Sequence, residues 1–238
     1  MTSFRKNFSI ILKFFVVLFV AVGITVSLST YYLDGYSHWT KRLLYFTTQS
    51  NLWIGAIELI IAISILRGKE NLDVLYAFKL AFTVAITMTM FVYCVILGPN
   101  ADEGYRAWSF SSVVLHAVVP ALAIADYFID DYRILYTKKH LFFTTVPPLI
   151  YLVFASVLHL FSVDFGRGVT YAYFFLNFST PAGLFGIMET PPTIGAFYWI
   201  IFFLIFVLML SSFFIATSPT NIIERRKYRK DKNKNASN

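Results

Sequence analysis

The second long apolar segment of the sequence opens with polar side chains that could do chemistry inside a membrane. Thr47 and Asn51 are four residues apart, so on a helix they share one face. A threonine hydroxyl is a weak nucleophile until a neighbouring base removes its proton, and histidine is the usual base near neutral pH. Asn51 or Gln49 could donate a hydrogen bond to the oxyanion that forms in such a reaction.

Two histidines lie in later apolar segments. His116 is in the fourth segment, and His159 lies about one helical turn from the end of the fifth. If successive segments cross a bilayer in alternating directions, Thr47, His116 and His159 all fall in the outer third of the membrane. A hydroxyl and two imidazoles at one depth are what a shared pocket would require.

Charged side chains also interrupt the apolar segments. Asp126 lies ten residues beyond His116, about 15 Å along a helix, which is too far to orient the imidazole directly. Glu58 and Lys79 fall at matching depth in the inner half of the membrane, so we predict a structural ion pair between them. The Lys13 side chain is expected to extend its ammonium group to the inner surface.

These polar residues have other interpretations. Polar groups inside a membrane are expensive and therefore functional candidates, but Thr and Ser there most often bond a backbone carbonyl or allow close helix packing. A transporter could line its pathway with the same side chains. A Thr47 or Thr48 hydroxyl within about 4 Å of a His116 nitrogen would favour a nucleophile and its base. A continuous polar path through Glu58 would favour transport.

Composition points to a membrane protein. Of the 238 residues, 58% are hydrophobic and 14% are charged, and the mean hydropathy is +0.66. Soluble domains are about half apolar and a quarter charged. The single cysteine, Cys94, excludes an internal disulfide and a thiolate metal site, and we expect it to be a small buried hydrophobe. Four scattered histidines give little support for a metal site, and we predict no metal and no cofactor.

Six apolar runs are long enough to cross a bilayer as helices. The fold class is therefore all-α, a polytopic integral membrane bundle of about six helices. Residues 1–220 are predicted to form a single membrane domain, and residues 221–238 a basic tail. Segment 164–193 is the longest loop and could cap one end of the bundle. The predicted spans are 8–29, 44–66, 74–98, 107–129, 140–163 and 194–217.

The distribution of Lys and Arg predicts the orientation. With the N-terminus inside, the cytoplasmic segments hold 14 of these residues and the outer loops hold four. Such an excess is typical of cytoplasmic loops, so both termini are expected in the cytoplasm. The formal net charge of +7 gathers in the tail, which indicates contact with anionic lipid headgroups rather than with nucleic acid.

Three phrases of the sequence form a recognisable pattern: residues 46–52, residues 115–120 followed by Asp126, and an aromatic block at 151–159 and 173–177. They resemble phrases of a bacterial family of six-span membrane proteins, which is distantly similar to the eukaryotic androgen-induced protein family. The resemblance covers roughly residues 10–210. The chain departs from the family's Y-P-F-L-E-like stretch, where it lacks the proline and has Asn177 in place of the acid.

This resemblance implies a function. The eukaryotic relatives are membrane hydrolases of fatty acid esters of hydroxy fatty acids, and they use a Thr and a His. It implies that Thr47, or its neighbour Thr48, is the nucleophile and that His116 is the histidine. We therefore predict a hydrolase of lipid-like esters in a bacterial cell membrane, whose substrate enters from the outer leaflet. A small transporter or lipid-binding protein, and a non-catalytic accessory subunit, remain as alternatives.

Overall fold

The computed structural model describes residues 3–99, 106–130, 132, 134–178 and 192–223. Within this part of the chain the secondary structure is helical, without β-strands, and six helical segments are long and apolar enough to cross a membrane. The prediction of an all-α, multi-pass membrane bundle is confirmed. The spans are Phe4–Ser29, Phe46–Leu66, Asp73–Leu97, Phe110–Ile129, Lys138–Leu160 and Gly195–Thr217.

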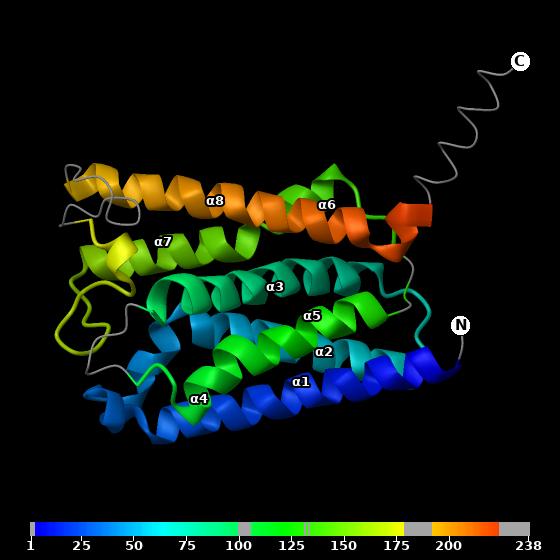
Figure 1. Cartoon of the computed structure of the whole chain (residues 1–238), viewed down its shortest axis with the longest axis horizontal. Helices are drawn as coiled ribbons and strands as arrows, with labels where there is room; N and C mark the ends of the chain where they lie inside the picture. Colours follow the sequence, from blue (N-terminus) through cyan, green and yellow to red (C-terminus); the bar gives the residue numbers. More distant parts are fainter. Residues whose placement is uncertain (1–2, 100–105, 131, 133, 179–191, 224–238) are drawn as a thin grey trace, which may run out of the picture.

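The long helices lie roughly along a common axis, and successive spans run in alternating directions between the two ends of the bundle (Figure 1). The N-terminus and the end of α8 (Pro192–Thr217) lie at one end, which we call the terminal end. The other end, which we call the loop end, holds the short helices η1 (Tyr31–Asp34), η2 (Trp39–Leu44) and η5 (Phe174–Leu176).

α3 (Asp73–Phe91) joins the two sides of the bundle. On one side it contacts α2 (Phe46–Leu66) and α5 (Val119–Ile129), both of which also contact α1 (Ser3–Ser29). On the other side it contacts α7 (Val146–Leu160) and α8. α2 and α5 are therefore packed between α1 and α3, whereas α7 and α8 cover the other side of α3 (Figure 1).

The fifth predicted span is broken into two helices. It consists of α6 (Lys138–Phe143) and α7, with Thr144 and Thr145 between them. Pro147 and Pro148 occupy the first turn of α7, where a missing backbone N–H leaves no helical bond unmade. The same prolines could not have continued α6, so the chain starts a new helix at this point.

Two segments are wound as π-helix. Val92–Leu97 (η3) extends α3, and Val114–Val118 (η4) lies between α4 (Phe110–Val113) and α5. In η4 the backbone N–H of Val119 donates to the carbonyl of Val114. The next bond of this type would need an N–H on Pro120, which has none, so the carbonyl of Leu115 is left for another donor.

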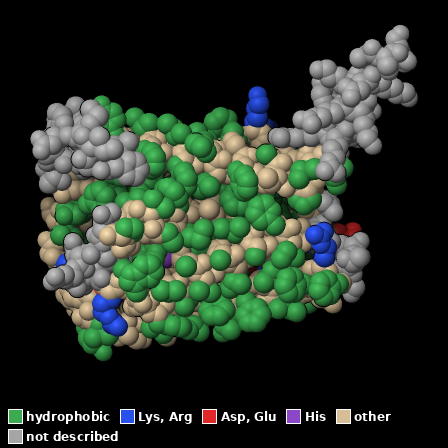
Figure 2. Space-filling view, viewed as in Figure 1, with side chains coloured by type: hydrophobic (Ala, Val, Ile, Leu, Met, Phe, Trp, Pro, Cys, Tyr) green, Lys and Arg blue, Asp and Glu red, His purple; other side chains and the backbone are tan. Residues whose placement is uncertain are grey.

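The middle of the bundle surface is apolar, and the Lys and Arg side chains visible in Figure 2 lie toward its two ends. The prediction that Cys94 is buried is wrong, because its side chain is exposed on this surface. Tyr93 and Ile96 occupy the inward face of η3, so Cys94 and Val95 face outward. The predictions for the tail, residues 221–238, and for the 164–193 loop lie partly outside the described residues.

Candidate active site

Thr47 and His116 form a hydrogen-bonded pair. Thr47 lies in the first turn of α2, His116 lies in η4, and the Thr47 Oγ1 to His116 Nε2 distance is 3.0 Å. His116 Nδ1 lies 2.8 Å from the backbone carbonyl oxygen of Ser112. Because a carbonyl only accepts, Nδ1 carries the ring hydrogen and Nε2 is the acceptor. The Thr47 hydroxyl therefore donates to a nitrogen that is ready to take its proton.

Tyr93 holds the His116 ring from one side. The two rings are stacked with centroids 4.0 Å apart and planes inclined by 16°. The Tyr93 hydroxyl donates to the backbone carbonyl of Ala107, which fixes the phenol in turn. Thus η3 and η4 meet at this stack, in line with the frequent occurrence of π-helical turns at functional sites. Stack and hydrogen bonds together fix the imidazole in one orientation.

Asn51 does not have the role that the sequence suggested. Its Nδ2 donates to the carbonyl of Thr47 at 2.8 Å and to the carbonyl of Leu115 at 3.0 Å. Both amide hydrogens are thereby used, so the prediction that Asn51 holds an oxyanion is wrong. Instead, Asn51 satisfies the carbonyl that Pro120 leaves without a helical donor, and so joins α2 to η4.

Thr48 and Gln49 point toward η2 rather than toward His116. The Thr48 hydroxyl donates to the carbonyl of Arg42 at 2.7 Å, and Gln49 Nε2 donates to the carbonyl of Leu43 at 3.2 Å. Consecutive helix residues point about 100° apart, which is why only one of the two threonines reaches the imidazole. Of the two possible nucleophiles, Thr47 is the one against His116.

His159 does not join this pair. Its Nδ1 lies 2.9 Å from the carbonyl oxygen of Thr170, and it is not among the described residues that line either cavity beside Thr47. α7 contributes Leu149 and Tyr151 to the site instead. His159 lies eight residues beyond Tyr151, about 12 Å farther along the helix, so the predicted three-residue pocket is wrong.

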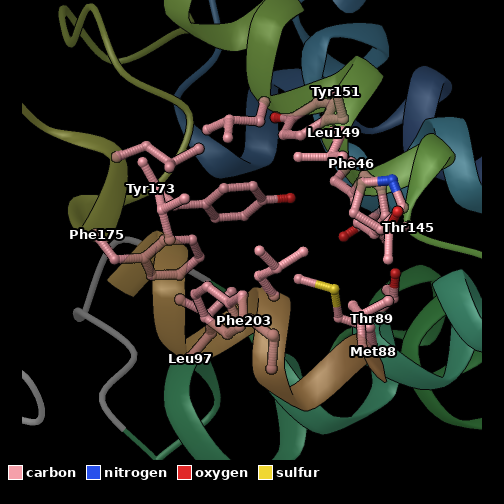
Figure 3. Close-up of a pocket in the computed structure, with 18 of the residues that line it drawn as sticks. Phe46, Met88, Thr89, Leu97, Thr145, Leu149, Tyr151, Tyr173, Phe175 and Phe203 are labelled. Carbon is pink, nitrogen blue, oxygen red and sulfur yellow. The ribbon is translucent and has the colours of Figure 1, made fainter. Parts of the chain in front are cut away.

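Thr47 and His116 lie where two cavities meet. One cavity is apolar, of about 90 Å³, and aromatic rings such as those of Tyr173 and Phe203 surround it (Figure 3). The other is polar and larger, about 460 Å³. Both linings include Thr47 and His116, so a molecule held at the pair could reach into both. The polar cavity is lined by Tyr36, Arg42, Tyr45, Ser111, Ser112 and Arg167, among others.

Two arginine side chains, Arg42 and Arg167, line the polar cavity. The Arg42 guanidinium pairs with Asp34 and lies 4.4 Å from the centre of the Tyr36 ring. Arg167 lies over the same ring and donates from Nε to the backbone carbonyl of Asp34 at 2.7 Å. Burial, with Tyr36 beside it, raises the pKa of the Tyr45 phenol far above its usual value, so this group stays a neutral donor.

The sequence did not indicate that Tyr93 and the two arginines belong to this site. Arg42 and Arg167 are far apart in the chain and were visible only as two of the few basic residues in loops. Tyr93 was one of 15 tyrosines, with no motif around it. Their grouping depends on how η2, η3 and the loop before η5 come together at the loop end.

The predicted Glu58–Lys79 pair belongs to a larger buried cluster. Lys79 Nζ lies 3.4 Å from Glu58 Oε1, and both side chains also approach Lys13 or Asp126. The prediction that Lys13 reaches the membrane surface is wrong, because its side chain is 0% exposed and lies 2.7 Å from Asp126. Asp126 on α5 faces α1, so the ammonium group finds a carboxylate inside the bundle. Asp126 therefore belongs to this cluster rather than to the candidate site, and among the described residues its hydrogen bonds go to Ser9, Lys13 and Lys79.

Among the described residues, no three His, Cys, Asp or Glu side chains are grouped in a way that could hold a metal ion. The candidate site is thus a half-buried hydroxyl paired with a buried imidazole, between an apolar cavity and a polar cavity lined by two arginines. No protein-family model, no curated protein and no solved structure matches this chain.

Proposed function

We propose that this protein is a membrane-embedded hydrolase of lipid-like acyl esters. One observation carries the proposal: the Thr47 hydroxyl lies 3.0 Å from His116 Nε2, while Nδ1 of the same ring is held by the Ser112 carbonyl. This is the arrangement of a hydroxyl nucleophile, its general base and a group that orients the base. A threonine that only packed helices would more often bond a carbonyl of its own helix, as Thr87 does with Thr83.

The reaction follows the ordinary course of acyl transfer. His116 Nε2 takes the Thr47 proton as the oxygen attacks the ester carbonyl carbon, and a tetrahedral oxyanion forms. The imidazolium then protonates the departing alkoxide, which leaves as the alcohol while the acyl group stays on Thr47. In the second half His116 takes a proton from a water molecule, whose oxygen attacks the acyl-threonine. The tetrahedral intermediate then collapses, the C–O bond to Thr47 breaks, and the imidazolium returns its proton to the Thr47 oxygen as the carboxylic acid leaves.

The oxyanion needs hydrogen-bond donors other than Asn51. Thr47 lies in the first turn of α2, where the backbone N–H groups have no partner within the helix. The residue before the helix, Tyr45, makes no side-chain cap to them. We assign the oxyanion to these N–H groups and to the positive end of the helix dipole.

Each of the two cavities would bind a different part of the substrate. The apolar cavity, with Phe46, Tyr151 and Phe203 in its lining, suits an acyl chain. The polar cavity, with Arg42 and Arg167, suits the polar part of the ester. The excess of Lys and Arg in segments at the terminal end supports a cytoplasmic location for both termini. The pair would then lie in the outer half of a bacterial cell membrane, and the resemblance to the androgen-induced protein family supports the same activity.

The proposal is tested by assaying fatty acyl ester hydrolysis by the purified protein. We expect Thr47→Ala and His116→Ala to lose about 100-fold or more in kcat, because each removes a group that acts in the transition state. Thr48→Ala is the matched control, since its hydroxyl bonds the Arg42 carbonyl, and it should keep most of the activity. Absence of turnover by the wild type, or equal activity in Thr47→Ala, would contradict the proposal.

A small transporter is a second candidate, and the buried ionic cluster around Glu58 favours it. Intramembrane charges often mark the pathway of an ion or a proton. Flux assays in proteoliposomes separate the two functions. Solute flux that survives in His116→Ala, without ester hydrolysis by the wild type, would favour transport.

A further inference from the structure

Five ionisable side chains meet inside the bundle, away from the candidate active site. Four of the chain's helical segments contribute one each, and Asp130 follows directly after α5. All five are at most 8% exposed. The members are Lys13 of α1, Glu58 of α2, Lys79 of α3, Asp126 of α5 and Asp130.

The two lysines and the two aspartates satisfy one another. Lys13 Nζ donates to Ser9 at 2.7 Å, to Asp126 at 2.7 Å and to Asp130 at 2.6 Å, which uses its three hydrogens. Lys79 Nζ donates to Asp126 and, at 2.9 Å, to Asp130. These four groups carry two positive and two negative charges, so they are electrically balanced without Glu58.

The aspartates have further donors. The Ser9 hydroxyl donates to Asp126 at 2.7 Å. The Tyr76 hydroxyl donates to both oxygens of Asp130, at 2.9 and 2.8 Å, and the backbone N–H of Tyr132 adds a bond of 3.1 Å. With this many donors, both aspartates are held as carboxylates.

Glu58 is the carboxyl group left over. It is 0% exposed, and neither of its oxygens has a hydrogen-bond partner among the described residues. The nearest ammonium groups are those of Lys79, at 3.4 Å, and Lys13, at 3.8 Å. Lys13 has no hydrogen left for Glu58, and Lys79, with two of its three hydrogens on the aspartates, makes no hydrogen bond to Glu58. An ionised Glu58 would therefore be a third negative charge beside two positive ones, buried and without hydrogen bonds.

We propose that Glu58 is a proton-binding site, whose carboxyl group holds one exchangeable proton in the resting protein. An isolated buried carboxylate is so costly that such a group neutralises instead. The charged groups that face Glu58 are Lys13 from α1, Lys79 from α3, and Asp126 and Asp130 from α5 and its end. The two aspartates repel a further negative charge, and a proton on Glu58 brings the cluster to neutrality.

The cluster borders a crevice at the terminal end of the bundle. A small crevice of about 20 Å³ there is lined by Lys79, Asp130 and Tyr132, next to the segment that follows α8. Asp130 and Lys79 line the crevice and also contact the rest of the cluster, so protons could exchange with solvent through them. Loss of the Glu58 proton to solvent would leave a net negative cluster, and the carboxylate would then compete with the aspartates for Lys13 and Lys79.

The test combines infrared spectroscopy with thermal unfolding of the full-length protein in lipid nanodiscs. At neutral pH the wild type should show a carbonyl band of a protonated carboxyl group that is absent from Glu58→Gln. The control is Glu70→Gln, the same change at an exposed residue, which should keep the band. Because Gln resembles protonated Glu, the Tm of Glu58→Gln should lie within about 3 °C of the wild type at neutral pH.

The pH dependence provides the second readout. As the pH is raised from 6 to 9, the Tm of the wild type should fall, because the proton favours the folded state, while the Tm of Glu58→Gln should stay level. Two results would overturn the proposal. One is the same carboxyl band in wild type and Glu58→Gln. The other is a loss of more than about 5 °C in Glu58→Gln at neutral pH, since this would mean that an ionised partner of the lysines had been removed.

Discussion

At the scale of single residues, each polar group of the site is limited to a few hydrogen-bond partners. His116 has a carbonyl on one nitrogen and a hydroxyl on the other, so only one tautomer fits. Asn51 has its two hydrogens on two carbonyls and cannot turn without breaking both bonds. Of the three side chains, Thr47 is therefore the one that can leave its hydrogen-bond partner and react with a substrate.

Tyr93 is a positioning residue, and its effect on the proposed activity can be measured. In Tyr93→Ala the ring stacked on His116 is lost, and aromatic stacks contribute about 0.5–1.5 kcal/mol beyond buried area. We expect kcat to fall roughly threefold to tenfold, with little change in KM, because substrate does not need the phenol to bind. Tyr93→Phe keeps the stack and loses only the hydroxyl bond to Ala107, so it should recover most of the kcat.

The comparison of these two variants separates positioning from packing. A purely structural role would lower the amount of folded protein and leave the kcat of the remainder unchanged. Equal kcat values in Tyr93→Ala, Tyr93→Phe and the wild type would contradict the assigned role.

At the scale of elements, the site depends on an irregular, π-helical stretch in one membrane-spanning helix. Pro120 removes an N–H, η4 is wound as π-helix, and the carbonyl of Leu115 turns to Asn51. Gly23 of α1 allows η4 to approach, since a Cβ there would lie 2.7 Å from the Leu115 side chain. The irregular helix is thus held by its neighbours on two sides.

Replacing Pro120 should separate activity from stability. Pro120→Ala restores an N–H that can bond within the helix, and alanine is about 3 kcal/mol more favourable than proline in a helix interior. We expect the Tm to be maintained or raised, while kcat falls roughly tenfold because η4 straightens and His116 moves from Thr47. Pro147→Ala, at the start of α7 where no helical N–H is required, should change neither. An unchanged kcat in Pro120→Ala would show that the π-helical turn does not matter.

The sequence was sufficient for the helices but not for their irregularities. Five of the six predicted spans both begin and end within about three residues of the observed ones, because roughly 20 apolar residues specify a crossing whatever surrounds them. Lys13 and Asn51 were interpreted wrongly because their partners lie more than 60 residues away in the chain. Periodicity places a residue on a face, but only packing decides which helix that face meets.

At the scale of the whole molecule, the two ends of the bundle differ in their buried polar groups. The loop end carries the reactive pair and its cavities, while the terminal half carries a buried ionic cluster that joins α1, α2, α3 and α5. Burial alone would raise the pKa of Asp130, but the Lys79 and Lys13 ammonium groups outweigh it and hold this pKa well below its usual range. Asp130 therefore stabilises the fold above the unfolded-state value of about 4, and this contribution is lost as the pH falls further.

The cluster should respond to the loss of Asp130 in a way that depends on Glu58. Asp130→Asn leaves two ammonium groups with one aspartate, so Glu58 is expected to release its proton and take the place of the missing charge. The single variant should then lose less stability than the roughly 3–5 kcal/mol typical of a broken buried pair, whereas Asp130→Asn combined with Glu58→Gln should lose at least that much. Thermal unfolding of the wild type, both single variants and the double variant gives the coupling between the two positions. Additive losses of stability would mean that Glu58 was already ionised or does not respond to Asp130. A coupling of about 1 kcal/mol or more would show that the charge states of the two carboxyl groups depend on each other.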